Sequence, residues 1–335
     1  MNILVLGGTQ FSGRAFVEQA SSNGHHITLL HRSPANPGLP DGVKRLVGDR
    51  DPKIGAGLGE IQKLIDEGHR WDAVVDMCGY VPRVVRESCE LLKSSCDLYL
   101  FISTISVYPR LGVQDTPDED SPLNTLKDNS VEEVNAETYG GLKVLCEQVV
   151  TEIFQDTHCI VRPGIIAGPN DPTDRITWWA RMLGTQDRVI VPAEPAGLAA
   201  FIDARDLAAF FETCITSSTT GIYNAVGPEP GLQMRSFISR THKALDSTSE
   251  LIEATPEQLA AHDLQPWVDI PTWALEDSQS MYRISASRAF AKGLQLRPLE
   301  ETMRDVNLWD IERGRPELKA GMSAERMQEV IDLLK

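Results

Sequence analysis

Short apolar runs alternate with amphipathic stretches along the first half of the chain. The runs have the length of strands and most of them are continuously apolar, which is typical of strands buried on both faces. The stretches between them repeat apolar residues every three or four positions, as Ile61, Leu64 and Ile65 do, which predicts helices. Strands are predicted at residues 3–6, 26–30, 43–47, 73–75, 98–102 and 159–161. Helices are predicted at about 13–22, at 84–92 and at about 136–154, and a further helix carries Ile61, Leu64 and Ile65 on one face. This order predicts an α/β protein whose parallel sheet carries helices on both faces.

The pattern loosens after residue 162, where proline, glycine and tryptophan become frequent. Later helices are predicted at 234–245, 286–292 and 324–334, without a regular alternation with strands. We therefore expect a doubly wound α/β domain over residues 1–162 and a smaller mixed part over residues 163–335. Some segments of this second part are expected to return to the sheet.

Composition and charge narrow the class of protein. The formal net charge of −16 counts against nucleic acid as a partner, since nucleic-acid binders present a basic face. The apolar runs are far too short to span a membrane, and the first strand follows Met1 directly, so no targeting segment and a cytoplasmic location are expected. The six cysteines lie far apart without metal-ligand spacing, so we expect free thiols and no metal site. The sequence does not indicate an oligomeric state.

A glycine-rich run separates the first strand from the first helix. It consists of Gly7, Gly8, Thr9, Gln10, Phe11, Ser12 and Gly13. Glycine permits a tight turn and a close approach to phosphate, and the free N–H groups at the start of a helix attract anions. A strand before the run and a helix after it are the context in which a Rossmann fold holds a dinucleotide pyrophosphate. The run therefore predicts a Rossmann-type sheet that binds a nicotinamide dinucleotide.

The residues after the second strand bear on the choice between NAD and NADP. In this fold the end of that strand faces the adenosine ribose, where NAD sites carry an acid and NADP sites carry a cation. The chain has His31, Arg32 and Ser33 at this place and no carboxylate. Because Arg32 can form a charge-assisted pair with a 2′-phosphate, NADP is the preferred cofactor. If Arg32 is only a solvated loop residue, the cofactor is NAD.

Tyr139 and Lys143 stand four residues apart on a predicted helix and therefore share one face of it. A phenol is a poor base at neutral pH, and a neighbouring ammonium favours its ionised form. Such a tyrosine can take a proton from an alcohol as hydride leaves, or give one to a carbonyl as hydride arrives. Ser103 and Thr104 follow the fifth strand, at the edge where open parallel sheets bind ligands. One of these hydroxyls can hold the substrate oxygen.

Taken in chain order, these motifs resemble the extended short-chain dehydrogenase/reductases, the NAD(P)-dependent epimerase/dehydratase family. The resemblance extends over almost the whole chain and includes residues 162–164, 201–207 and 221–224. It implies that Thr104 and Tyr139 are catalytic, and that Lys143 assists both and also holds the nicotinamide ribose.

The same resemblance implies further contacts with the cofactor. Asp49 is similar to the acid that lies near the adenine. Cys78 and Gly79 correspond to the stretch that passes the nicotinamide half, and Ser103 belongs to the same part of the site.

Three positions depart from the pattern of the family. Gln10 replaces the middle glycine of the usual G-x-x-G-x-x-G fingerprint. The resulting G-G-T-x-F-x-G variant is similar to a subgroup of bacterial reductase-like proteins and chloroplast stem-loop RNA-binding relatives. Ile165 stands where sugar-nucleotide epimerases favour asparagine, and Ala199 stands where they tend to carry an arginine that grips the diphosphate. These losses imply a substrate that is smaller than UDP-glucose or unlike it.

The resemblance implies an NAD(P)-dependent oxidoreductase or epimerase that acts on the alcohol or carbonyl of a small polar substrate. Reduction, oxidation, epimerisation and dehydration all stay open, because they share the same hydride and tyrosine chemistry. Tyr80, Arg175 and Trp178 are candidate substrate contacts, with packing between the two parts as the alternative for the tryptophan. The alternative function is a non-catalytic protein of the same fold that senses the dinucleotide or binds RNA. The complete set of Thr104, Tyr139 and Lys143 and the negative charge count against it.

Overall fold

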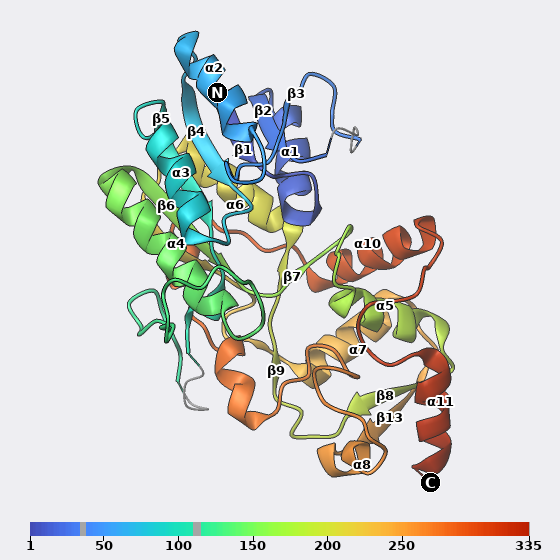
Figure 1. Cartoon of the computed structure of the whole chain (residues 1–335). Helices are drawn as coiled ribbons and strands as arrows, with labels where there is room; N and C mark the ends of the chain where they lie inside the picture. Colours follow the sequence, from blue (N-terminus) through green and yellow to red (C-terminus); the bar gives the residue numbers. More distant parts are fainter. Residues whose placement is uncertain (34–37, 110–114, 335) are drawn as a thin grey trace.

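A seven-stranded parallel sheet forms the upper half of the molecule in Figure 1. The computed structural model describes residues 1–33, 38–109 and 115–334. The strands of the sheet are β1 (Asn2–Leu6), β2 (His26–His31), β3 (Lys44–Val47), β4 (Trp71–Asp76), β5 (Cys96–Ile102), β6 (His158–Pro163) and β11 (Gly221–Ala225). Their order is β11-β6-β5-β4-β1-β2-β3, and each neighbouring pair is parallel. The predicted Rossmann-type sheet is confirmed, and β11 shows that a segment beyond residue 162 completes it.

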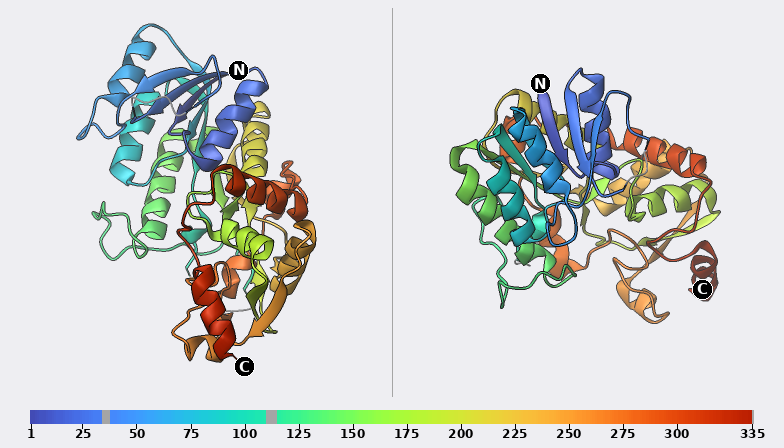
Figure 2. Two further views of the ribbon diagram at one scale, coloured as in Figure 1. Left: turned by 90° about the vertical axis from the view of Figure 1, so that its right-hand side faces the viewer. Right: turned by 45° about the horizontal axis from the view of Figure 1, so that its top comes forward.

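Helices cover both faces of this sheet, as Figure 2 shows from two further directions. One face carries α1 (Phe11–Ser22) and α6 (Ala204–Thr216), and the other carries α2 (Gly57–Asp66), α3 (Pro82–Leu92) and α4 (Tyr139–Phe154). In β1, Ile3 and Val5 pack toward α1 and α6, whereas Leu4 and Leu6 pack toward α2, α3 and α4. Successive side chains of a strand point to opposite faces, so a strand covered on both sides is apolar throughout.

Residues beyond β6 build a second core in the lower half of Figure 1. Its helices are α5 (Arg175–Thr185), α7 (Met234–Ala244), α8 (Pro256–Ala260), α10 (Leu299–Glu312) and α11 (Ala324–Leu333), and α9 (Ser287–Ala291) lies against β11. Its strand pairs are β7 (Ile166–Ala167) with β10 (Ile202–Asp203), β8 (Arg188–Pro192) with β13 (Glu250–Ala254), and β9 (Leu198–Ala199) with β12 (Leu232–Gln233). Short 3₁₀ turns lie at Ile105–Val107, Gln155–Thr157 and Glu276–Tyr282. Only the β9–β12 pair is antiparallel among the described strand pairs.

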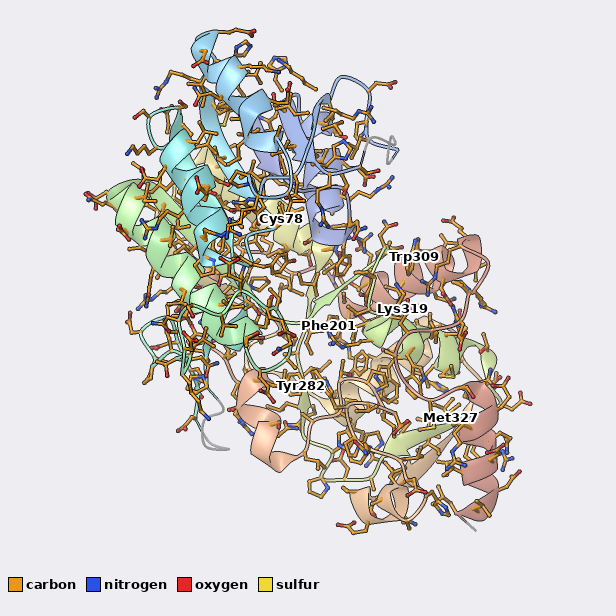
Figure 3. The ribbon with its side chains drawn as sticks, in the orientation of Figure 1. Cys78, Phe201, Tyr282, Trp309, Lys319 and Met327 are labelled. Atoms are coloured by element: carbon orange, nitrogen blue, oxygen red, sulfur yellow. The ribbon has the colours of Figure 1, made fainter. Side chains whose placement is uncertain are left out.

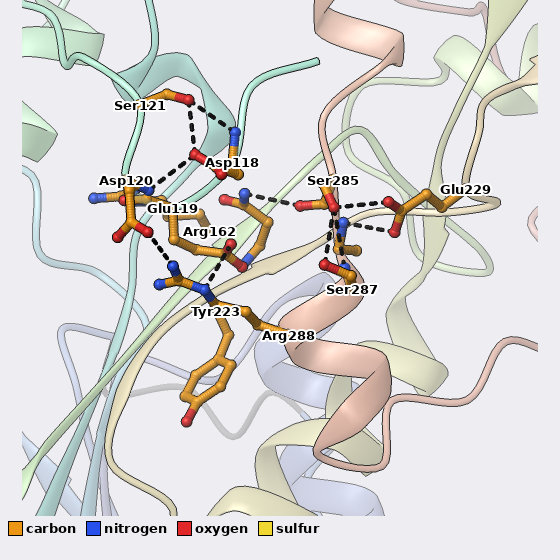
Figure 4. Close-up of polar contacts among 12 residues, drawn as sticks. Asp118, Glu119, Asp120, Ser121, Arg162, Tyr223, Glu229, Ser285, Ser287 and Arg288 are labelled. Atoms are coloured by element: carbon orange, nitrogen blue, oxygen red, sulfur yellow. Dashed lines mark hydrogen bonds and ion pairs between the residues drawn. The ribbon is translucent and has the colours of Figure 1, made fainter.

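An acidic stretch before α4, which includes Asp118, Glu119 and Asp120, forms polar contacts with β11 and α9 (Figure 4). Arg288 in α9 pairs with Asp120, and its Nε lies 3.5 Å from Oε2 of Glu119. The other carboxylate oxygen of Glu119 accepts a hydrogen bond from the N–H of Asn224 at 2.8 Å. Glu119 is buried, so its two partners offset the cost of removing the charge from water. These contacts hold the stretch beside the carboxyl ends of β6 and β11.

Candidate active site

The chain reverses its course through the sheet between β1 and β4. From β1 the strands continue through β2 to β3 on one side, and from β4 through β5 to β6 on the other. Open α/β sheets bind ligands at such a switch point, beyond the carboxyl ends of the strands. A groove of about 640 Å³ opens there and is lined by residues that follow β1, β2, β3, β4 and β5. Cys78, labelled in Figure 3, lies at this edge of the sheet.

The glycine run forms the turn from β1 into α1. Gly7 and Gly8 have φ values of +92° and +84°, a left-handed region that favours glycine. A Cβ on Gly13 would lie 2.7 Å from the Cα of Gly8, so the first turn of the helix packs directly on the run. Helix α1 begins at Phe11, two residues before the predicted start at residue 13. The groove is lined by all of Gly7, Gly8, Thr9, Gln10, Phe11, Ser12 and Gly13.

His31, Arg32 and Asp49 line the end of the groove beyond β2 and β3. Arg32 is largely exposed, and its Nη1 lies 3.9 Å from Oδ2 of Asp49. The buried His31 ring keeps Nε2 without a hydrogen-bond partner among the described residues. Burial and the nearby Arg45 guanidinium lower the pKa of His31, so its ring is neutral near pH 7. Ser33 is exposed and does not line the groove.

Thr104 and Tyr139 meet at the opposite end of the groove. Burial raises the pKa of Tyr139, and a hydrogen bond with Thr104 opposes that rise. The Thr104 hydroxyl also caps the turn that follows β5, where it accepts the N–H of Ser106 at 3.1 Å. The neighbouring Ser103 lines the groove with a buried hydroxyl that has no partner among the described residues. The tyrosine and threonine are therefore placed to hold one oxygen atom between them.

Lys143 is buried one helical turn below Tyr139. Its ammonium donates hydrogen bonds to the carbonyl oxygens of Gly79 at 2.7 Å and Ile102 at 2.6 Å, and lies 4.2 Å from the centre of the Phe101 ring. An ammonium has three donors, so one remains for the groove that Lys143 also lines. Burial lowers the pKa of Lys143, while the nearby negative groups oppose this effect.

Two glycines bring α4 close to the turn after β5. A Cβ on Gly140 would overlap the carbonyl oxygen of Ser106, and a Cβ on Gly141 would lie 2.6 Å from the side chain of Leu126. Larger residues after Tyr139 would push the tyrosine away from the threonine. The local sequence therefore sets the spacing of the two proposed catalytic groups.

The helix begins at Tyr139 and not at the predicted residue 136. The Asn135 side chain accepts hydrogen bonds from the N–H groups of Glu137 and Thr138, at 3.0 and 3.1 Å. Such side-chain bonds compete with helical ones and hold a turn before the helix.

The structure brings one of the three predicted substrate residues to the groove. Tyr80 lines it, with its ring centre 6.3 Å from that of Tyr139. Arg175 lies outside the lining residues, with its guanidinium 5.7 Å from the centre of the Trp267 ring. The prediction that Trp178 is a substrate contact is wrong, since its side chain is fully buried in the second core and its Nε1 donates to the Met322 carbonyl at 2.8 Å.

Sequence reasoning missed a buried ion pair beneath the groove. Arg50 follows Asp49 and turns inward, where its guanidinium meets both carboxylate oxygens of Asp76 at 2.5 and 2.9 Å. The signal was available in part, since Asp76 directly follows the apolar residues 73–75 and a buried carboxylate requires a partner. Nothing local in the sequence indicated that its partner is Arg50.

The groove fits a dinucleotide on observations of the chain itself. Its glycine run leaves a cradle that side chains would fill, and this cradle stands at the N-terminus of α1. Two buried polar atoms, Nε2 of His31 and Oγ of Ser103, lie in groove-lining residues at opposite ends and lack partners among the described residues. Buried polar atoms are normally hydrogen-bonded, so both positions call for a polar ligand.

Other kinds of site are not found in the part of the chain that the structure describes. Residues 1–33, 38–109 and 115–334 contain no group of three or more His, Cys, Asp or Glu residues that could hold a metal ion. Within the same ranges no helix combines the length and apolar character needed to cross a bilayer. All six cysteines are free.

The sheet order, the glycine cradle and the groove define a Rossmann-type protein of the extended short-chain dehydrogenase/reductase class. A family model described as "NAD dependent epimerase/dehydratase family" matches residues 3–226, and the chain belongs to this family. The predicted G-G-T-x-F-x-G subgroup is a finer assignment that this match does not address.

Similar proteins agree with this assignment. The chain is 26% identical over 200 residues to dTDP-4-dehydrorhamnose reductase of Mycolicibacterium smegmatis (strain ATCC 700084 / mc(2)155), a match of 58% of this chain and 55% of that enzyme. The chain thus spans about half the length of this curated relative. The crystal structure of the Bordetella bronchiseptica enzyme WbmH in complex with NAD+ has a TM-score of 0.67 at 14% identity, covering 93% of this chain and 99% of that one. Human epimerase family protein SDR39U1 with NADPH has a TM-score of 0.60 at 17% identity, covering 92% and 99%. These two likenesses show the fold.

Proposed function

We propose that the chain is an NAD(P)-dependent oxidoreductase or epimerase acting on an alcohol or carbonyl carbon. The observation that carries this proposal is the meeting of Thr104, Tyr139 and Lys143 at one end of a groove whose other end is a glycine cradle. The bound dinucleotide would accept or supply the hydride. The curated relative is named as a reductase, which agrees with this chemistry.

Each of the three residues has its own part in this mechanism. The Thr104 hydroxyl would hold the substrate oxygen beside the Tyr139 phenol, which lines the same end of the groove. Tyr139 would exchange the proton of that oxygen, as a general base in oxidation and a general acid in reduction. Lys143 would favour the phenolate by its positive charge and use its remaining donor to hold the nicotinamide ribose.

The preferred cofactor is NADP. Arg32 stands at the end of β2, is largely exposed and lines the groove, so its guanidinium is available to a 2′-phosphate. Among the described residues its ionic contact is the long one with Asp49 at 3.9 Å, which holds the guanidinium only weakly. The related structures named above hold NAD+ in one case and NADPH in the other.

The substrate is proposed to be a small polar molecule and not a nucleoside diphosphate sugar. Near Tyr139 the groove is lined by uncharged side chains such as Tyr80, Val81 and Pro163, beside the Lys143 ammonium. Ala199 is buried in the β9–β12 pair and Ile165 packs against the apolar cluster around Tyr282, labelled in Figure 3. Neither can bind a diphosphate. Tight binding of a UDP-, GDP- or dTDP-sugar in calorimetry would contradict this choice.

The experiment begins with mass spectrometry of the purified protein for retained NAD or NADP. A screen of alcohols and carbonyl compounds at 340 nm then identifies a substrate. Tyr139→Phe should reduce turnover about 10²–10⁴-fold while cofactor affinity survives, since general acid–base catalysis contributes that much. Tyr223→Phe is the matched control, because it removes a phenol hydroxyl from a tyrosine outside the groove and should retain most activity. Undiminished turnover in Tyr139→Phe would remove this tyrosine from the mechanism.

A further inference from the structure

The turn after β4 supplies one of the two carbonyl groups that hold Lys143. Gly79 is the acceptor, at 2.7 Å from the ammonium nitrogen. The turn has no room for a side chain at this residue, because a Cβ there would lie 2.5 Å from the Phe101 ring and 3.1 Å from Oδ2 of Asp76. The position of the Lys143 ammonium therefore depends on how firmly this turn is held.

Asp76, the last residue of β4, forms a hydrogen bond with the backbone of this turn. Its Oδ1 accepts the N–H of Cys78 at 3.1 Å, and its Oδ2 accepts the hydroxyl of Tyr99 at 2.8 Å. The carboxylate is fully buried, and it lies close enough to Lys143 to raise the pKa of that ammonium. Asp76 is thus both a mechanical support for the turn and a negative charge beside the lysine.

Arg50 pairs with the Asp76 carboxylate in this buried place and partly balances its charge. The two residues form a bidentate pair, and Ser88 Oγ accepts from Nε and Nη2 of Arg50 at 3.1 and 2.8 Å. Burial alone would raise the pKa of the Asp76 carboxyl, but the guanidinium holds it below its usual value. Arg50 also lines the groove, so the pair connects the β3 end of the site with Lys143.

Several ionisable groups face the Lys143 ammonium. From the sheet side they are Asp76 and, behind it, Arg50, and from the turn after β4 they are Cys78 and Tyr80. From α4 itself they are Cys146, Glu147 and the preceding Tyr139. Glu147 is engaged by Arg162 through both of its oxygens. Asp76 is therefore the carboxylate outside α4 whose charge reaches Lys143.

We infer that Arg50 and Asp76 are positioning residues for Lys143. Asp76 holds the turn that carries the Gly79 carbonyl and supplies the negative charge that faces the ammonium, while Arg50 keeps that carboxylate in place and partly cancels its charge. The inference rests on the proposed role of Lys143. Its test uses the cofactor-free protein without substrate, so it can fail independently of the proposed reaction.

The test is an NMR titration of the Lys143 side chain in protein labelled with ¹³C at lysine Cε. The Lys143→Arg variant assigns the signal, and circular dichroism and thermal denaturation check the fold of each variant. In Asp76→Asn the midpoint of the titration should move to lower pH by about one unit, a tenfold loss of proton affinity. In Arg50→Met it should move to higher pH, because the Asp76 carboxylate then acts on Lys143 without its partner.

The opposite signs separate this role from a merely structural one. Loosening of the turn would move both midpoints in the same direction, and such a result would overturn the inference, as would no movement in either variant. In the double variant Arg50→Met/Asp76→Asn both charges are gone, and the midpoint should return toward that of the unmodified protein. Ser88→Ala is the matched control, since it removes hydrogen bonds to Arg50 but keeps both charges, and it should leave the midpoint unchanged. If Asp76→Asn does not fold, a rise in Arg50→Met without one in Ser88→Ala supports the inference, and equal values contradict it.

Discussion

Arg162 of β6 and Glu147 of α4 form a buried bidentate ion pair, with Nε–Oε1 at 2.9 Å and Nη2–Oε2 at 2.6 Å. Glu147 lies one helical turn beyond Lys143, so the pair ties the helix that carries the proposed catalytic residues to the sheet. Arg162 also donates to the Tyr108 hydroxyl at 2.8 Å, which extends the connection to the turn that follows Thr104. Arg162 therefore holds both the helix that carries Tyr139 and the turn that follows Thr104.

Breaking this pair should destabilise the protein strongly. Glu147→Gln leaves the Arg162 guanidinium buried without its counter-charge, and such a loss costs about 3–5 kcal/mol of unfolding free energy. Urea denaturation measures the change. The control is Glu152→Gln on the same helix, whose partner Arg86 is solvent-exposed, and it should cost about 1 kcal/mol or less. Equal costs for the two variants would show that the buried pair has no special role.

Gly140→Ala should disturb the start of α4. The added methyl group would overlap the Ser106 carbonyl, and forced packing of this kind costs about 1–3 kcal/mol. Turnover should fall as well, because Tyr139 must shift away from Thr104. Gly59→Ala in α2 is the matched control, since its Cβ would meet no atom within 4 Å. In that variant the free energy of unfolding should rise by about 0.5–1 kcal/mol, because alanine favours a helix more than glycine does. Thermal denaturation of both variants measures the two changes.

Arg32→Ala should weaken binding of NADPH about 10–100-fold and leave binding of NADH nearly unchanged, because only NADPH carries the 2′-phosphate. Fluorescence titration of the reduced cofactors measures both affinities. Arg70→Ala removes the same charge from an exposed arginine that does not line the groove, so it controls for net charge. Equal NADPH affinities in the two variants would favour NAD as the cofactor.

The ion pair between Asp51 and Arg83 should make stability depend on acid pH. Hydrogen bonds from Arg83, at 2.9 and 2.8 Å, lower the pKa of Asp51 to about 2. A carboxyl group whose pKa is lower in the folded state stabilises the fold above its unfolded pKa, near about 4, and this stabilisation disappears as the pH falls toward 2. The stability difference between the protein and Asp51→Asn should therefore shrink as the pH is lowered from about 5 to 3.

Denaturation curves at several pH values measure this difference. In an Arg83→Met background, Asp51→Asn should have little further effect, since the partner of the carboxylate is already gone. A difference that stays constant over the acid range would contradict the assigned ion pair.

The order of strands and helices in the sheet could be predicted because it depends on neighbours in the sequence. Apolar runs such as residues 73–75 identified buried strands, and Gly7, Gly8 and Gly13 identified the turn that follows β1. The four-residue spacing of Tyr139 and Lys143 placed both on one helix face, as the structure has them.

The contacts of long side chains could not be predicted in the same way. Aromatic residues occur in both pockets and cores, so the sequence did not distinguish a substrate contact from packing at Trp178. The hydrogen bond to Met322, 144 residues away, and the packing around it place Trp178 in the second core. Helix α4 begins later than predicted because the Asn135 side chain accepts hydrogen bonds from the backbone N–H groups of Glu137 and Thr138. The spacing of apolar residues does not reveal such a bond.

The sequence by itself determined the class of fold, the place of the dinucleotide cradle and the pairing of Tyr139 with Lys143, since each follows from residues close together in the chain. Only the tertiary structure decided which buried charges meet. Arg50 and Asp76 are 26 residues apart, and Arg162 and Glu147 belong to different elements. A buried charge needs a counter-charge within hydrogen-bond distance, and the partner is chosen by how the strands and helices pack. The sequence thus indicated the groups that we propose to react, and the packing of the elements decided which residues hold them in place.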